Sequence, residues 1–440
     1  MQQYSRRVVI TGMGVVCPLG STKDSLWDGL RAGRSGVGPL EMLSGGNLPV
    51  AFGAQARQFR TDDIECFGNL EKERKKAIRK GLKMMCREIQ MGLAVGQLAL
   101  EDSAGVVESL APERIGVDFG SDYMLTTPED FVEAIRGCLD EQGQFDFSDW
   151  APKGMPKMTP LWLLRYLPNM PASHLAIYND LRGPNNSLTL REAAANAATT
   201  EALQVIRRGC ADAMVAGATG TRLAPLKLLH TLQQEELANG AVEPNKASRP
   251  FDLNRTGAVL GEGAGAVVLE ALDAAQKRGA TIYGELVAGA SCSSAGPKLA
   301  AHRGRAMANV LRCVMEAAST TPDEIGHVHA HGLSTRTCDA EEAAAIQQVF
   351  AARKTPVPVV AAKSYFGNLG AGSGLVELIA SVMALRAGTL FPVLNYQTPD
   401  PQCPVAAVTD LATPAGASFI NLSVTPQGQA SAVLVRRFEG

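Results

Sequence analysis

The segment from residue 183 to residue 217 reads GPNNSLTLREAAANAATTEALQVIRRGCADAMVAG, and it predicts a strand, a sharp turn, a buried helix and a second strand. Polar and apolar residues alternate from 186 to 190, as they do in a half-buried strand. Residues 191–208 contain no Gly or Pro and are rich in Ala and other good helix formers. Glu192 therefore lies where the strand ends and the helix begins.

The junction at Glu192 suits a negative charge. The first N–H groups of a helix lack partners within the helix, and the aligned peptide dipoles leave a partial positive charge there. The small side chains from Ala193 to Ala195 indicate a helix that is packed on all sides. The simplest interpretation of Glu192 is still an ordinary acidic residue in a first helical turn.

The composition is that of an ordinary globular protein. Of the 440 residues, 46% are hydrophobic and 20% are charged, and 42 Lys and Arg against 44 Asp and Glu give a formal net charge of -2. This balance provides no basic surface for nucleic acid. No apolar run suggests a membrane span, and the N-terminal residues MQQYSRRVVITG enter a predicted strand directly instead of a signal peptide. We therefore expect a cytoplasmic protein that binds no nucleic acid and has no membrane span.

Motifs for cofactors and metals are incomplete. Gly12 and Gly14 form a predicted turn after the first strand, but the third glycine of a dinucleotide-binding fingerprint is missing. The nine Cys include no CxxC pair, and His327, His329 and His331 alternate along a predicted strand without nearby residues spaced to complete a zinc shell. We expect no metal and no cofactor.

Strands alternate with helices along the chain, which predicts an α/β protein with covered sheets. Two stretches, at 190–192 and at 363–374, place a buried strand and a turn of small or polar residues ahead of a helix. This pattern suggests an internal duplication, with an N-terminal half at 1–255 and a C-terminal half at 256–440. The stretch 120–171 is predicted to be an insertion that covers one face.

Polar clusters follow two predicted strands of the second half. His331 enters the polar turn GLST, with Asp339 and Glu342 beyond it, and Lys363 opens the cluster KSYFGN, which ends at Asn368. A lone His at a strand end is usually a structural residue. Two such turns, together with an acidic residue at a helix start, indicate an active site.

A basic run, EKERKKAIRKGLKMMCR, occupies residues 71–87 and is predicted to continue as a helix through residue 100. The usual role of such a run is a solvated helix face. The functional alternative is a docking surface for an acidic carrier protein, and its candidate residues are Arg74, Lys75 and Lys76.

Long motifs spread over the whole chain resemble the elongating β-ketoacyl-[acyl-carrier-protein] synthases of the thiolase-like superfamily. These motifs are RRVVITGMGVVCPLG at 6–20, GCADAMVAGA at 209–218, ASRPFDLNRTGAVLGEGAGAVVLE at 247–270, AHGLSTRTCDAEEAAAI at 330–346 and KSYFGN at 363–368. The resemblance implies a five-layered αβαβα fold made of two similar halves. It also implies an acyl carrier protein as a partner, and a dimer whose sheets join across the interface.

The resemblance also assigns roles to the candidate site residues. His331 corresponds to the first active-site His of a working synthase, Lys363 is retained, and Asp339 and Glu342 are the supporting acidic residues. The catalytic Cys of the family falls at Glu192.

Two further elements depart from the family pattern. The second active-site His falls at Asn368. The glycine-rich gating loop near the C-terminus is replaced by SVTPQG at 423–428, which contains Thr425. Three functional elements of the family, counting the nucleophile, therefore differ together.

These departures weaken the expected condensation chemistry. Acyl transfer needs a thiolate or a similarly strong nucleophile, and a carboxylate is a poor one towards a thioester. Cys210 is no substitute, because it lies at the far end of the same helix, roughly 27 Å away at about 1.5 Å per residue. The loss of the second His removes a donor that would stabilise the enolate of a decarboxylating malonyl thioester. We do not expect condensation by this chain alone.

Three functions are then open. The first is a non-condensing partner, similar to a chain-length factor, that forms a heterodimer with a Cys-containing ketosynthase in fatty-acid or polyketide synthesis. The second is a stand-alone enzyme, such as a malonyl-carrier-protein decarboxylase, that uses His331 and Glu192. The third is an acyl-binding scaffold homodimer without chemistry. The protonation state of Glu192 is also open, because burial favours the neutral acid and a helix N-terminus favours the anion.

Overall fold

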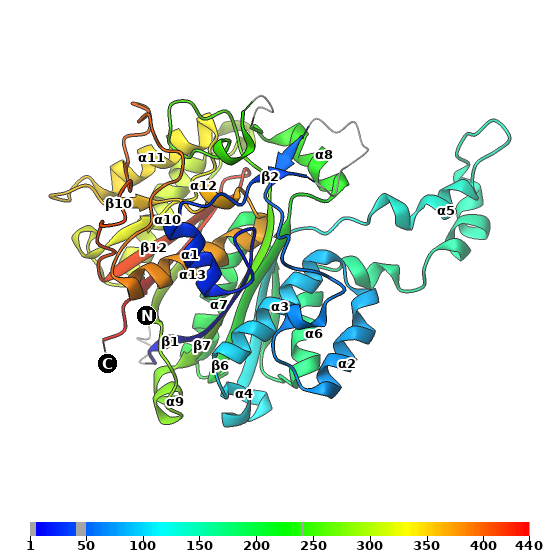
Figure 1. The fold of residues 1–440 in the computed structure, drawn as a ribbon, viewed down its shortest axis with the longest axis horizontal. Helices are drawn as coiled ribbons and strands as arrows, with labels where there is room; N and C mark the ends of the chain where they lie inside the picture. Colours follow the sequence, from blue (N-terminus) through cyan, green and yellow to red (C-terminus); the bar gives the residue numbers. More distant parts are fainter. Residues whose placement is uncertain (1–5, 41–49, 239–241, 440) are drawn as a thin grey trace.

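The computed structural model describes residues 6–40, 50–238 and 242–439 (Figure 1). The strands are β1 (Val8–Val16), β2 (Gly38–Pro39), β3 (Phe52–Gly53), β4 (Ile115–Ser121), β5 (Asn185–Thr189), β6 (Ala213–Thr221), β7 (Glu262–Ala271), β8 (Gly284–Ser293), β9 (His327–His329), β10 (Pro358–Val360), β11 (Ala406–Ala407), β12 (Ser418–Val424) and β13 (Gln429–Arg436). The helices are α1 (Lys23–Arg31), α2 (Lys72–Gly81), α3 (Arg87–Asp102), α4 (Val106–Ser109), α5 (Val132–Arg136), α6 (Met170–Asn179), α7 (Ala194–Arg207), α8 (Pro225–Gln234), α9 (Leu272–Lys277), α10 (Arg303–Ala317), α11 (Arg336–Phe350), α12 (Lys363–Phe366) and α13 (Ser373–Ala387).

Within the described residues, eleven strands form one continuous sheet in the order β11-β10-β9-β12-β13-β8-β1-β7-β6-β4-β5. Its two halves repeat the same pattern of strand directions. In the first half the pairs β1–β7 and β7–β6 are antiparallel, whereas β6–β4 and β4–β5 are parallel. In the second half β8–β13 and β13–β12 are antiparallel, whereas β12–β9 and β9–β10 are parallel. This repetition confirms the predicted architecture of two similar halves.

The boundary between the halves lies later in the chain than the predicted division at residue 255. β7 begins at Glu262, beyond that division, yet it pairs with β1 and β6 of the first half. The second half begins with β8, which meets β1 through two residue pairs. The division at 255 was placed too early because β7 returns to the N-terminal strand, and this long-range pairing is not visible in the local sequence pattern.

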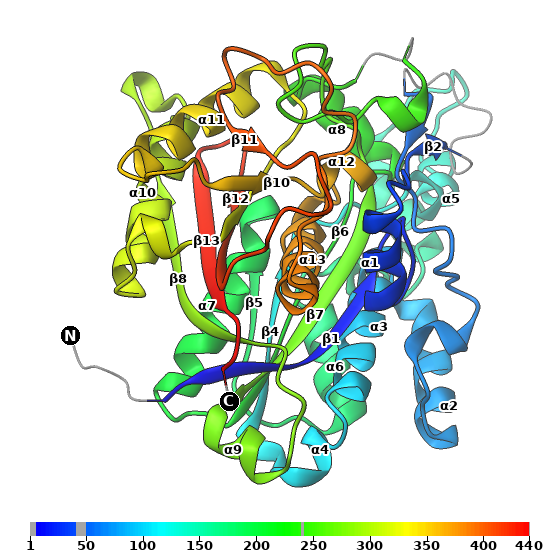
Figure 2. The ribbon, with the colours of Figure 1, turned by 60° about the vertical axis from the view of Figure 1, so that its left-hand side comes forward.

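Helices α7 and α13 lie between the two halves of the sheet (Figure 2). α7 packs against β4 and β6 on one side and against β8 and β13 on the other, and α13 packs against β7 and β12. On the outer faces, α3 and α6 cover the first half, while α10 covers the second half and carries α11. The layers therefore run helix, sheet, helix, sheet, helix, as predicted.

The central position of α13 explains its apolar sequence. The window Gly370–Ala387 has the length and hydropathy of a membrane span, but 83% of it is buried inside the protein. A helix that is packed on all sides needs apolar residues around its whole circumference. The apolar character of α13 is therefore that of a core helix.

Gly12 and Gly14 lie inside β1, and the turn predicted at this point is absent from the described strand. A Cβ at Gly12 would approach the carbonyl oxygen of Ala99 to 2.3 Å, and one at Gly14 would approach that of Val95 to 2.1 Å. Both carbonyls belong to α3. The two glycines therefore allow α3 to pack directly on the strand, which is a common reason for Gly within a sheet.

The residues between Met124 and Tyr166, which both pack in the core of the body, form an arm around α5 that projects away from the body (Figure 1). The predicted insertion is present, but it does not cover a face of its own chain. Phe131 stacks on Trp150 and makes an edge-to-face contact with Trp162. Large apolar side chains on its surface are Ile135, Leu139, Phe145, Phe147, Met155, Leu161 and Leu163. An exposed apolar surface of this kind is typical of a protein–protein contact.

Candidate functional site

Glu192 lies on a 3-10 turn, η9 (Arg191–Ala193), between β5 and α7. Arg191 has a φ of 52°, a left-handed conformation that costs energy in any residue other than glycine. This turn directs the chain sharply from the strand into the central helix. Glu192 is 1% exposed and sits between the two halves of the molecule, close to β12 and β13.

The Glu192 carboxylate is bound by three side chains. Arg222, which follows β6, forms an ion pair with Oε1 and is itself completely buried. Asn368 donates from Nδ2 to the same oxygen at 3.1 Å. Arg191 Nε lies 3.6 Å from Oε2. The side chain is therefore held from both halves of the fold.

The two arginines have further acidic partners. Asp122 Oδ2 lies 3.3 Å from Arg222 Nη1. Glu235 Oε1 accepts a hydrogen bond from Arg191 Nη2 at 2.5 Å. Two guanidinium groups thus face three carboxyl groups in a buried cluster.

Burial by itself would raise the pKa of Glu192. The guanidinium groups of Arg222 and Arg191 outweigh burial and hold the pKa below the ordinary value of a Glu. Burial, together with the charge of Glu192, raises the pKa of Glu235. The ion pair with Arg222 and the direction of this shift favour the anionic form of Glu192, one of the two alternatives that the sequence left open.

His331 and Lys363 meet on the side of the second half. Lys363 Nζ donates to the carbonyl oxygen of His331 at 2.8 Å and lies 3.4 Å from Nδ1 of the ring. Lys363 also forms a buried ion pair with Glu377 of α13. Burial and the charge of Lys363 hold the pKa of His331 well below its ordinary value, so the imidazole is neutral.

Asp339 and Glu342, in the first turns of α11, hold the backbone around His331. Glu342 accepts hydrogen bonds from the N–H groups of His331 at 2.6 Å and Gly332 at 2.8 Å. Asp339 accepts one from Leu333 at 3.0 Å. Burial raises the pKa of Asp339 to about 6 and that of Glu342 to about 8. These two carboxyl groups are positioning residues for the His331 turn.

The amide of Asn368 is oriented by its own neighbours. Its Oδ1 accepts hydrogen bonds from the N–H of Gly370 at 3.0 Å and from the Ser373 hydroxyl at 3.3 Å. These donors fix the oxygen on that side, so Nδ2 faces Glu192. The hydrogen bond that Asn368 directs into the site is thereby taken up by the Glu192 carboxylate.

Thr425 begins the turn between β12 and β13. Its carbonyl oxygen accepts from the N–H of Gly428 at 3.0 Å, and its Oγ1 accepts from the N–H of Gln429 at 3.3 Å. The neighbouring Gln427 accepts a hydrogen bond from Arg191 Nη1 at 3.4 Å through Oε1. The turn therefore reaches the Glu192 cluster through Gln427, and Thr425 shapes the turn.

The structure does not bring the basic candidates into this cluster. Arg74, Lys75 and Lys76 lie on α2, a separate surface helix, where Lys75 pairs with Glu65 at 2.7 Å. The helix predicted to run from the basic segment to residue 100 is interrupted at 82–86. Met85, in this interruption, has an extended backbone, and the chain then turns into α3.

Arg222, Asp122 and Glu377 were not recognised in the sequence. Glu377 is the one acidic residue in SGLVELIASVMALRA, and a charge in the buried part of a helix requires a partner. This signal indicates that a partner exists, and the structure shows that the partner is Lys363. Arg222 follows the apolar strand AMVAGATGT, but its partner Glu192 lies 30 residues earlier. Their contact depends on how β6 and η9 are placed in the fold, so no local pattern reveals it.

His327 and His329 have a structural role. Both contact the Ser381 hydroxyl, His327 through Nε2 at 3.1 Å and His329 through Nδ1 at 2.8 Å. Burial lowers the pKa of His327 to about 4. His331 lies beyond the end of β9 and contacts Lys363 instead, so the three histidines do not share one site.

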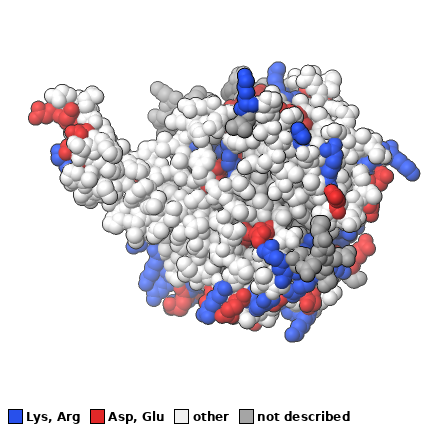
Figure 3. Space-filling view, turned by 180° about the vertical axis from the view of Figure 1, so that it is seen from behind, with Lys and Arg blue, Asp and Glu red and all other residues white. Residues whose placement is uncertain are grey.

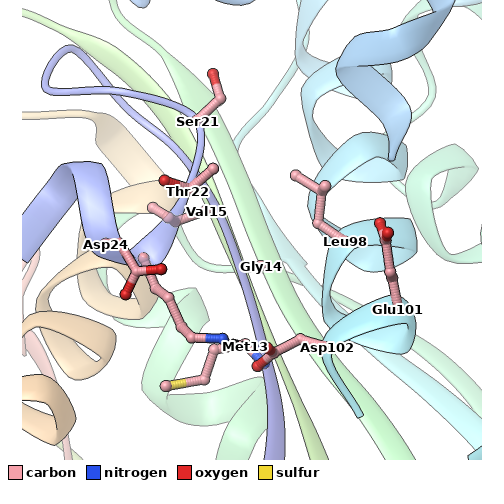
Figure 4. A pocket seen from close by; sticks show the side chains of 10 residues that line it. Met13, Gly14, Val15, Ser21, Thr22, Asp24, Leu98, Glu101 and Asp102 are labelled. Carbon is pink, nitrogen blue, oxygen red and sulfur yellow. Dashed lines mark hydrogen bonds and ion pairs between the residues drawn. The ribbon is translucent and has the colours of Figure 1, made fainter. Parts of the chain in front are cut away.

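A cavity of about 380 Å³ lies elsewhere, between β1, the start of α1 and the end of α3 (Figure 4). Asp102 Oδ2 accepts a hydrogen bond from the N–H of Met13 at 2.9 Å, and Asp102 also pairs with Lys23. The residues that line this cavity are Met13, Gly14, Val15, Ser21, Thr22, Lys23, Asp24, Leu98, Glu101 and Asp102. None of them belongs to the Glu192 cluster, so the two features are separate.

Two family models cover most of the chain. The β-ketoacyl synthase N-terminal domain matches residues 5–275, and the β-ketoacyl synthase C-terminal domain matches residues 283–397. The chain therefore belongs to the β-ketoacyl synthase family. The junction between the two matches falls between β7 and β8, where strand pairing also divides the structure.

Similar proteins agree with this assignment. The 3-oxoacyl-[acyl-carrier-protein] synthase 2 of Vibrio cholerae is 34% identical over 397 residues, and that of Synechocystis sp. is 31% identical over 399 residues; each match covers 90% of both chains. A solved structure of a type II PKS acyl-carrier protein in complex with its ketosynthase bound to the hexaketide aligns with a TM-score of 0.83 at 25% identity, over 99% of this chain and 100% of that chain. The ishigamide ketosynthase/chain length factor aligns over the same shares with a TM-score of 0.81 at 25% identity. The thiolase-like fold is confirmed.

Proposed function

We propose that the chain is a non-condensing member of its family: a subunit similar to a chain-length factor, which pairs with a Cys-containing ketosynthase in fatty-acid or polyketide synthesis. The observation that carries the proposal is the buried ion pair between Glu192 and Arg222. By its motifs, Glu192 stands at the position of the family's nucleophile.

A carboxylate in this environment does not replace a catalytic thiolate. Glu192 Oε1 is bound by Arg222 and Asn368, and both guanidinium groups near the carboxylate reduce its basicity. Attack on a thioester would break these contacts and would form an anhydride from an already weak nucleophile. Condensation therefore requires a second subunit that supplies the Cys.

A stand-alone malonyl-carrier-protein decarboxylase fits the site less well. Decarboxylation of a malonyl thioester creates an enolate, which needs donors aimed at its developing negative charge. Asn368 already donates to Glu192, and the anionic carboxylate of Glu192 would face the enolate. Neutral His331 can donate a hydrogen bond to the enolate, but the neighbouring Glu192 anion would repel the negative charge of the enolate.

Two surface features support a partner of the same fold. β5 is the end strand of the sheet, so one of its edges is unpaired in the described chain. Seen from behind, the surface between the arm and the body carries few charged side chains (Figure 3). Ile177 of α6 is 70% exposed, and Phe147 of the arm is 76% exposed. An edge strand beside an apolar surface suits a dimer, with either a second copy or a ketosynthase.

An acyl carrier protein is the second proposed partner. α2 presents Lys72, Lys76, Arg79 and Lys80 to solvent, next to the half-buried Arg74 and Lys75. A helix with this charge attracts an acidic protein through long-range electrostatics. The carrier protein in the similar solved complex is bound to its ketosynthase, which supports the same class of partner here.

Native mass spectrometry of the protein recovered from its own source tests the proposed role. We expect a heterodimer with a ketosynthase that has a Cys nucleophile. As a control, the E192Q variant is produced together with the ketosynthase and measured in the same way. It should give the same heterodimer, because the change keeps the shape of the side chain. Exclusive homodimers would contradict the proposal. Homodimers that release carbon dioxide from a malonyl carrier protein would favour the decarboxylase, and homodimers that hold acyl chains without turnover would favour a scaffold.

A further inference from the structure

Cys292 and Cys313 form a pair of neighbouring thiols on the surface of the second half. Cys292 lies near the end of β8, and Cys313 lies on α10, which packs over that strand. Their Sγ atoms are 3.9 Å apart. Cys313 is exposed and Cys292 is partly exposed.

The arrangement of the two side chains is suited to a disulfide. Bond formation requires the sulfur atoms to approach to about 2.0 Å, which rotation about the two Cα–Cβ bonds supplies when the thiols already touch. A strand and the helix packed on it hold the two residues side by side, with the two sulfur atoms in contact. Burial and the neighbouring sulfur of Cys313 raise the pKa of Cys292 to about 11, so the exposed Cys313 is the better first nucleophile.

The pair is linked to the Glu192 cluster by a short series of contacts. In β8, Cys292 is in register with Ala430 of β13. Two residues further on, the N–H of Ser294 donates to the carbonyl oxygen of Gly428 at 3.0 Å. Gly428 follows Gln427, which accepts a hydrogen bond from Arg191. The segment that begins at Cys292 thus packs against the turn that contacts the site.

The chain between the two cysteines includes an exposed turn. Ala295 bridges to Ala301, and the N–H of His302 donates to the carbonyl oxygen of Ser294 at 3.0 Å. Lys298, at the tip, is exposed and has a φ of 60°. A covalent bond between residues 292 and 313 would close this turn into a loop and restrict its opening.

We propose that Cys292 and Cys313 are a reversible thiol–disulfide site that reacts with small disulfides such as oxidised glutathione and, when oxidised, restrains the 294–302 turn against the 425–428 turn. Disulfides that form in reducing compartments are mostly transient and redox-sensing. The thiol chemistry does not depend on the proposed partner role.

The reaction proceeds by two exchanges. The Cys313 thiolate attacks one sulfur of glutathione disulfide; the S–S bond of the reagent breaks, one glutathione thiolate leaves, and a mixed disulfide remains on Cys313. The Cys292 thiolate then attacks Sγ of Cys313, forms the intramolecular bond and releases the second glutathione. Two protein thiols are oxidised, one glutathione disulfide is reduced to two glutathione molecules, and the two thiol protons are taken up by the leaving thiolates.

The test is oxidation of the full-length protein with glutathione disulfide, followed by tryptic peptide mapping without reduction. We expect one linked pair of peptides that contains Cys292 and Cys313, and its loss after treatment with a reductant. Trypsin cleavage after Lys298 should be roughly tenfold slower in the oxidised protein, because the closed loop opens less readily. The variants C292S and C313S should show no slowing, and Ser keeps the size of each side chain.

Cys210 provides a matched control, because it is also exposed. C210S should behave as the wild type in both measurements. The proposal is overturned if Cys292 and Cys313 are found only as separate glutathione adducts, or if Cys313 links to Cys210 of another molecule. The proposed restraint of the 294–302 turn is overturned if the disulfide-linked protein is cleaved after Lys298 as fast as the reduced protein.

Discussion

Glu192 and Arg222 form an ion pair in which neither side chain is more than 1% exposed. The pair joins the turn after β5 to the segment after β6, and Asp122 also contacts the guanidinium. A buried charge that loses its partner is far more costly than a buried pair that is replaced as a whole. The contributions of Glu192 and Arg222 to the stability of the fold are therefore coupled.

Removal of Arg222 alone should destabilise the protein strongly. R222M leaves the Glu192 carboxylate buried with the more distant Arg191, and we expect a loss of about 3–5 kcal/mol in the free energy of unfolding. The double variant E192M/R222M should recover part of that loss, because it removes both charges of the pair and leaves Asp122 as the carboxylate without its arginine. Urea denaturation measures the free energy of unfolding of both variants. In the exposed pair Arg136–Glu133, whose side chains are 68% and 69% exposed, R136M should change stability by less than about 1 kcal/mol. A double variant no more stable than R222M would contradict the coupling.

The stabilising effect of Glu192 should depend on pH. Its pKa is lower in the folded protein than the value of 4.5 expected for an unpaired Glu. The folded state therefore binds this proton less readily than the unfolded state. The resulting stability is fully present above about pH 4.5 and is lost as the pH falls towards the folded pKa. The stability difference between the wild type and E192Q, measured by chemical denaturation, should be constant near neutral pH and should shrink below about pH 4.5. A difference that grows on acidification would show that Glu192 is not the anion.

The sequence was sufficient for the fold and for part of the site. The alternation and helix-forming pattern around residues 186–208 placed Glu192 correctly at the strand–helix junction, because these signals are local. The position of Glu192 beside Asn368 also agrees with the motif comparison. Arg222 and Asp122 were missed because their contacts depend on strand order. The boundary at 255 and the expected covering role of the arm were wrong for the same reason: the pairing of β7 with β1 and the direction in which the arm leaves the body have no local sequence pattern.

We propose that Glu192 occupies the position of the family's nucleophile, and a Cys introduced there alone should not create a condensing enzyme. In E192C, a thiol would lie beside Arg222 and Arg191, which favour the thiolate. Asn368 would still stand at the position that we propose for the second His, and the absence of one such donor costs roughly 10²–10³ in rate. We expect no β-ketoacyl product from E192C with an acyl carrier protein that bears an acyl chain and a second one that bears a malonyl group, and more product from E192C/N368H. Mass spectrometry of the carrier-bound acyl chain measures the amount of β-ketoacyl product that each variant forms. Abundant product from E192C alone would contradict the assigned role of Asn368.

Charge reversal on α2 should weaken binding of the acyl carrier protein. Lys76 is exposed, whereas Lys75 is engaged with Glu65, so K76E changes the surface charge without breaking an ion pair that the helix uses. We expect weaker binding by fluorescence anisotropy, with the largest loss at low salt, where screening is weakest. Lys354 is exposed and follows α11, a helix that lies far from α2 in Figure 1; K354E changes the net charge equally and should bind as the wild type does. Equal losses in K76E and K354E would mean that net charge, and not α2, governs binding.

Charged residues on the arm should disrupt association without unfolding the subunit. Phe147 and Leu161 are 76% and 66% exposed, so their replacement by Asp removes little packing within the chain. If the arm contacts a partner subunit, F147D/L161D buries two carboxylates in that contact, and such burial is strongly unfavourable without a counter-charge. Analytical ultracentrifugation should show a shift from dimer to monomer, while the urea midpoint of the isolated subunit stays unchanged. L253D, at an exposed Leu outside the arm, should leave the dimer intact. A double variant that remains fully dimeric would exclude the arm as the interface and would leave the free edge of β5 as the surface to test.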